Sequence, residues 1–121
     1  MEKKNNNILL EKSFAFAVRI VKAYKYLLEQ KSEYVLPKQF LRSGTSIGAN
    51  VKEAMGAKST AEFFAKLSIS YKEARETNYW IRLLVETQFF EKKDAESLLD
   101  EVIELQKIIA KIRITTQQNN L

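Results

Sequence analysis

The spacing of the apolar residues constrains the fold of this chain more than any other feature. Near both ends of the sequence, apolar residues recur at alternating steps of four and three. The first series is Leu10, Phe14, Ala17, Val21, Tyr24 and Leu28, and the last is Leu98, Val102, Leu105, Ile109 and Ile112. Such spacing is typical of one face of an α-helix. One proline and three glycines in 121 residues also leave too few turn residues for an all-β chain.

Start and stop signals divide the chain into four predicted helices, at about residues 7–31, 37–55, 60–87 and 91–115. Pro37 suits the first turn of the second helix, where its missing N–H costs nothing, and Gly56 suits the end of that helix. Ser59 and Glu62 form a capping box that opens the third helix. The short connections predict an all-α, antiparallel up-down-up-down four-helix bundle in a single domain. We expect the polar tail at residues 116–121 to be frayed.

The chain contains no histidine and no cysteine. It therefore lacks a histidine acid or base, a thiol nucleophile, a disulfide framework and the commonest metal ligands. A carboxylate metal site in a helical bundle would also need Glu-x-x-His pairs. We expect no enzyme, no metal and no cofactor. Since 45% of the residues are apolar and 29% are charged, the chain is typical of a globular protein, and an interaction module is the remaining class.

The chain carries no sign of a membrane segment. Its apolar stretches are far shorter than the roughly 18 residues that a spanning helix needs. The run from Ile8 to Leu10 is also too short for the apolar region of a signal peptide. We expect a cytoplasmic protein without a membrane partner.

A second group of apolar residues falls away from the expected core when each helix is drawn at about 100° per residue. These residues are Phe16 and Tyr26 in the first helix, Ile69, Trp80 and Leu83 in the third, and Leu99, Ile103 and Ile114 in the fourth. Single exposed apolar side chains are normal, but this number would leave larger patches than a monomer usually exposes. We expect them to form an interface between copies of the chain. Partial burial under a tilted bundle is the alternative.

The second predicted helix is unusually small and polar. Its expected core stripe is Phe40, Gly44, Ile47, Val51 and Ala54. Gly44 and Gly48 are poor helix formers, so they indicate either a close approach of a neighbouring helix or a weak point in this one. Five polar residues lie at the facing edges of the second and third helices: Ser46, Asn50, Glu53, Ser70 and Glu73. We expect them to form a structural polar cluster that fixes the register of the two helices.

The run from Leu36-Pro37 to Glu53, with Ser46-Ile47 and Asn50, and the later Ser70-x-x-Glu73, resembles the 23S ribosomal RNA intervening-sequence protein family. The resemblance covers nearly the whole chain, although Ala54 and Ala74 stand where the family commonly has Gly and Leu. It implies a small bacterial four-helix-bundle protein, without enzymatic activity, that assembles into a homo-oligomeric ring, expected to be a pentamer. It also implies kinship with the accessory protein of diversity-generating retroelements. That protein is a basic pentameric barrel that works with a reverse transcriptase and nucleic acid.

Positive charge is concentrated in the first half of the chain. Residues 1–59 hold 11 basic and 5 acidic side chains, whereas residues 60–121 hold 9 and 10, within a net charge of +5. The outward basic and aromatic residues are Lys12, Arg19, Lys22 and Tyr26 on the first helix and Lys38, Arg42 and Lys52 on the second. A positive strip with an aromatic ring is suited to a phosphate backbone, while a solvated helix face is the plainer reading.

Two functions follow from this surface. The first is an oligomeric adaptor that binds RNA or DNA in a sequence-tolerant and salt-sensitive way, because no base-reading motif is present. The second is a protein–protein scaffold without nucleic-acid affinity, whose outer helices contact a partner such as a reverse transcriptase.

Overall fold

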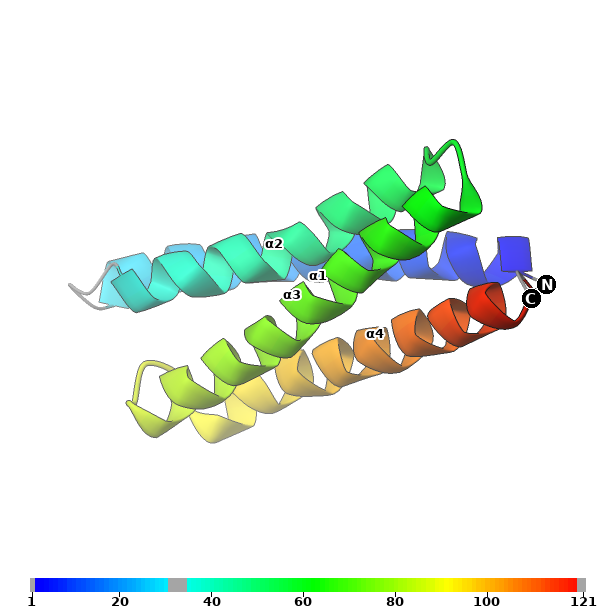
Figure 1. The fold of residues 1–121 in the computed structure, drawn as a ribbon. Coiled ribbons are helices and arrows are strands. Elements are labelled where there is room, and N and C mark those ends of the chain that lie inside the picture. Colours follow the sequence, from blue (N-terminus) through cyan, green and yellow to red (C-terminus); the bar gives the residue numbers. More distant parts are fainter. Residues whose placement is uncertain (1, 31–34, 120–121) are drawn as a thin grey trace.

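The computed structural model describes residues 2–30 and 35–119, and this part of the chain forms four α-helices and no strand. The helices are α1 (Glu2–Gln30), α2 (Val35–Met55), α3 (Thr60–Glu86) and α4 (Lys92–Asn119). Successive helices run in opposite directions, so the first and last helical turns lie at the same end (Figure 1). Each helix contacts the next, and α4 also contacts α1, which closes the bundle. The predicted all-α four-helix bundle is confirmed.

The helix ends differ from the predicted ones by two residues or more in three places. The second helix begins at Val35, which the prediction placed in the loop, so Pro37 is its third residue and still lies in the first turn. The first helix begins at Glu2 rather than near Asn7. The last helix continues to Asn119, so residues 116–119 are helical and not frayed as expected. Within this extension the Thr116 hydroxyl donates a hydrogen bond to the Ile112 carbonyl at 2.8 Å. The predicted end of the first helix at residue 31, the connection through residues 33 and 34, and the tail residues 120–121 lie outside the described residues.

The start of α3 carries the predicted cap with one difference. Ser59 Oγ accepts a hydrogen bond from the Glu62 backbone N–H at 3.1 Å, as a capping residue does. The Glu62 carboxylate reaches back to the backbone N–H of Lys58 at 2.9 Å, one residue before the expected donor. The two bonds still fix the chain direction where α2 ends and α3 begins.

The face of α1 that enters the core is not the predicted one. Phe14, which was expected in the core, is 71% exposed, and Val21 is 37% exposed. Phe16, which was expected on the outside, is only 1% exposed. The buried face of α1 consists of Leu9, Ser13, Phe16, Ile20 and Leu27. Both faces of α1 are apolar at helical spacing, so the periodicity alone could not separate them.

The core faces of α2 and α4 are the predicted ones. Every residue of both predicted series is buried, from Phe40 to Ala54 in α2 and from Leu98 to Ile112 in α4.

Within the described residues no helix has both the length and the apolar character needed to cross a bilayer.

Two glycines set the distance between α1 and α2. A Cβ atom on Gly44 would lie 2.7 Å from Ile20 Cγ1, and one on Gly48 would lie 3.1 Å from the Ser13 carbonyl oxygen. A larger residue at either position would push the helices apart. Of the two interpretations of these glycines, the structure supports a close approach of a neighbouring helix.

Candidate functional site

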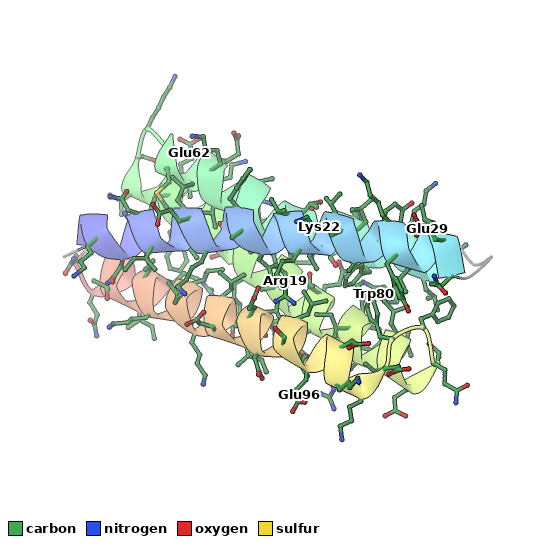
Figure 2. All side chains as sticks on the ribbon, turned by 180° about the vertical axis from the view of Figure 1, so that it is seen from behind. Arg19, Lys22, Glu29, Glu62, Trp80 and Glu96 are labelled. Atoms are coloured by element: carbon green, nitrogen blue, oxygen red, sulfur yellow. The ribbon has the colours of Figure 1, made fainter. Side chains whose placement is uncertain are left out.

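The basic side chains predicted on α1 are partly used within the bundle. Lys12 Nζ lies 3.2 Å from Glu104 Oε1, and Arg19 pairs with Glu101. Arg19 also donates to the Ser97 hydroxyl at 3.0 Å. Figure 2 shows Arg19 reaching from α1 across to α4. These two cations therefore join α1 to α4.

Arg42 has a comparable role between α2 and α3. Its guanidinium donates to Glu73 at 2.9 Å and to Glu76, and its Nε donates to Gln39 at 3.2 Å. The hydrogen bond with Glu76 raises the pKa of Arg42 above its ordinary value. Arg42 is thus a surface link between helices, with two carboxylates balancing its charge.

The remaining candidates are exposed but do not share one face. Within the described residues, Lys22, Lys38 and Lys52 form no ion pair, and Tyr26 is 51% exposed. Lys22 and Tyr26 line a groove at the α1–α4 side, whereas Lys52 lines a different groove between α1 and α2. The seven residues predicted as one basic strip are therefore divided among three sides of the bundle.

The five residues expected to form one polar cluster also separate. Ser70 is buried, and its hydroxyl donates to the Ile47 carbonyl at 2.8 Å, across α3 and α2. Asn50 donates to the Ser46 carbonyl at 2.9 Å, within its own helix. The other three members also make separate contacts. The Ser46 hydroxyl donates to the Arg42 carbonyl, the Glu73 carboxylate pairs with the Arg42 side chain, and Glu53 is exposed.

A second buried hydroxyl contact was missed by the sequence reasoning. The Thr77 hydroxyl donates to Ser43 Oγ at 3.0 Å, and both residues are fully buried. Thr77 follows Ser70 by seven residues, and Ser43 precedes Ile47 by four, so both fall on core faces. A hydroxyl residue on each core face was the signal in the sequence that could have predicted this contact. The two buried hydroxyls of α3, Ser70 and Thr77, thus fix its register against α2.

The predicted interface residues fall into three groups. Phe16 is a core residue, as described above, and is no longer a candidate. The half-buried residues are Trp80, Leu83, Leu99 and Ile103, of which all but Leu83 pack against the core. For Trp80, Leu99 and Ile103 the alternative of partial burial under a tilted bundle fits better. The exposed residues are Tyr26, Ile69 and Ile114.

An apolar surface lies where the sequence reasoning did not place one, between α1 and α2. A groove of about 590 Å³ there is lined by Leu10, Glu11, Phe14, Ala17, Thr45, Gly48, Ala49 and Lys52. We call it the α1–α2 groove. Val18 and Val21 follow Phe14 and Ala17 by four positions each, so they share that face of α1, and they are 39% and 37% exposed. Apolar patches of this kind on soluble proteins usually mark interaction sites.

The chain is similar to proteins of one family over most of its length. A family model described as 23S rRNA-intervening sequence protein matches residues 5–111. A solved structure of a protein with unknown function from the S23 ribosomal protein family of Bacteroides thetaiotaomicron shares 46% sequence identity with it. That likeness covers 90% of this chain and 97% of the other, with a TM-score of 0.88. Among curated proteins no match was found.

Proposed function

The chain belongs to the 23S rRNA-intervening sequence protein family, and from this premise we propose that it is a non-catalytic adaptor that assembles with copies of itself and binds nucleic acid. The family description refers to ribosomal RNA, so RNA is the first ligand to test. In this proposal, exposed basic side chains contact the phosphate backbone without reading the sequence.

One observation carries the nucleic-acid part of this proposal. Two of the predicted cations, Lys22 and Lys38, are exposed, lie outside the α1–α2 groove and form no ion pair with a described residue. A cation that meets a phosphate releases condensed counterions, which favours binding. A cation already paired with a carboxylate, such as Arg42, contributes less to phosphate binding. Assembly would multiply the number of free lysines on one particle.

The α1–α2 groove supports the assembly part. Its apolar lining comes from both helices, and Phe14 stands at its edge with most of its ring exposed. Burying such a ring favours association by about 1.5–3 kcal/mol. We therefore assign the groove to contact with a second copy, in a closed oligomer for which we keep five copies as the expected number.

Binding to a labelled single-stranded RNA, measured by fluorescence anisotropy over a range of salt concentrations, tests the proposal. We expect the double variant K22E/K38E to bind at least about fivefold more weakly and to lower the salt slope by about 1.4, because two phosphate contacts are lost. A matched control is K92E/K93E, which makes the same change of net charge at exposed positions of α4. Equal binding by the two variants would contradict the assignment of Lys22 and Lys38 to phosphate contact.

The α1–α2 groove also favours a second candidate function, a protein–protein scaffold. In this case the wild-type protein would show no affinity for RNA or DNA at physiological salt. A protein partner, such as a reverse transcriptase, would instead bind the assembled outer helices. The anisotropy experiment separates the two candidates, since only the adaptor binds nucleic acid.

A further inference from the structure

The outer side of α3 carries a groove that no candidate site above includes. It has a volume of about 560 Å³ and is lined by Arg75, Asn78, Tyr79, Arg82, Leu83, Glu86 and Gln106. Arg75, Tyr79 and Arg82 follow one another at steps of four and three, so they share a face of α3. We call this the α3 groove.

The cations of the α3 groove differ from Arg19 and Arg42 in being unpaired. Both Arg75 and Arg82 are exposed, and neither forms an ion pair or hydrogen bond with a described residue. Glu86 is the one carboxylate in the lining. The groove therefore has an excess of positive charge, on guanidinium groups whose geometry suits phosphate oxygens.

Tyr79 gives the groove an aromatic surface between the two arginines. Its side chain is 59% exposed, and its ring forms a T-shaped pair with the Trp80 ring, with centroids 5.1 Å apart. The amide of the adjacent Asn78 donates to Gln106 Oε1 at 3.1 Å, which ties α3 to α4. Tyr79 is thus held by its contact with Trp80 while more than half of its side-chain surface stays exposed to a ligand.

The groove at the α1–α4 side also combines cations with an aromatic ring, but its charges are balanced. It is smaller, at about 380 Å³, and its lining places Arg19 and Lys22 with Glu91 and Asp94. Arg19 is also already paired with Glu101. An anion inside that groove would meet no net positive charge, so the α3 groove is the better anion site.

From these features we infer that the α3 groove binds single-stranded nucleic acid, with a base stacked on Tyr79 and flanking phosphates held by Arg75 and Arg82. This inference rests on the proposed function and adds to it a second contact surface with a preference for unpaired bases. A duplex would bind less well here, because its bases are stacked on one another and do not expose a face to Tyr79.

Equilibrium binding of labelled oligouridylate, oligothymidylate and an RNA duplex tests this inference. We expect Tyr79→Ala to weaken binding of the single strands about fivefold or more and to leave duplex binding unchanged, because only an unpaired base stacks. Tyr79→Phe keeps the ring and should restore binding. The double variant R75Q/R82Q should lower the salt slope by about 1.4 for single strands, because two phosphate contacts are lost. Comparison of oligouridylate with oligothymidylate shows whether the strand is RNA or DNA.

The control for charge is K92Q/K93Q, which removes two exposed cations of α4 outside the groove. If Y79A and R75Q/R82Q bind single strands as the wild type does, while K22E/K38E binds them more weakly, the α3 groove is overturned and the proposed function is kept. Equal losses of affinity and slope in R75Q/R82Q and K92Q/K93Q would also overturn it. Absence of any nucleic-acid binding by the wild-type protein at low salt would overturn both proposals.

Discussion

At the scale of the residue, the contacts of α2 depend on side chains that differ greatly in size. Gly44 and Gly48 let α1 approach on one side, and Arg42 holds α3 on the other through Glu73 and Glu76. The hydroxyl of Ser43 is buried between these contacts and accepts a hydrogen bond from Thr77. The two glycines weaken the helix propensity of α2, and packing against α1 and α3 offsets this loss.

Gly44→Ala should destabilise the fold. Its new Cβ would lie within 2.9 Å of three atoms of Ile20, which is fully buried and stiff because it is β-branched. Alanine gains up to about 1 kcal/mol of helix propensity, but overpacking costs about 1–3 kcal/mol. We expect a net loss of about 1 kcal/mol in the free energy of unfolding, measured by urea denaturation with circular dichroism.

Gly56→Ala is the control for this substitution, since its Cβ would meet only the Glu53 carbonyl at an ordinary 3.7 Å. It should not lower the urea midpoint. A Gly44→Ala variant as stable as the Gly56→Ala variant would show that Ile20 moves aside at no cost.

At the scale of the element, α1 has two apolar faces with different environments. One face, with Phe16 and Ile20, is buried in the bundle. The other, with Phe14 and Val18, lies along the α1–α2 groove and is exposed in the single chain. The same helix can therefore contribute to the core and to an intermolecular surface.

Truncation of each phenylalanine should separate the two faces. Phe16→Ala should lower the free energy of unfolding by about 3–5 kcal/mol, because it leaves a cavity in the core. Phe14→Ala should change it by less than about 1 kcal/mol in dilute solution, because the ring contacts mainly solvent there. Urea denaturation at low protein concentration compares them, and a similar loss in both variants would contradict the burial of Phe16 and the exposure of Phe14.

At the scale of the whole molecule, charge and apolar surface are arranged differently from their distribution along the sequence. The excess of basic residues in the first half is partly balanced by α3 and α4, through the pairs of Lys12, Arg19 and Arg42. The α1–α2 groove and the α3 groove lie on different helices, so assembly through the first leaves α3 to contact a ligand.

Light scattering should give the wild-type protein a mass several times that of the 14.0 kDa chain, with five copies as the expected number. The double variant F14E/V18E should be close to a single chain, because two charges would have to be buried without partners. Val35→Glu is the control, since Val35 is 67% exposed and lies outside the groove. A wild-type monomer at micromolar concentration would contradict self-assembly. If F14E/V18E remains oligomeric, the interface is not at the α1–α2 groove, and the exposed residues Tyr26, Ile69 and Ile114 are the next candidates.

The sequence by itself determined the four helices, the Ser59 cap and the core faces of α2 and α4. Helix formation and capping depend on neighbours within a few residues, and in those two helices the most regular apolar series is the buried one. Only the tertiary structure decided which face of α1 is buried. It also decided that Arg42 pairs with Glu76 and that Ser43 meets Thr77, each pair 34 positions apart in the chain. Such contacts depend on how far one helix is rotated and shifted against the next, and this packing geometry is set by all four helices together.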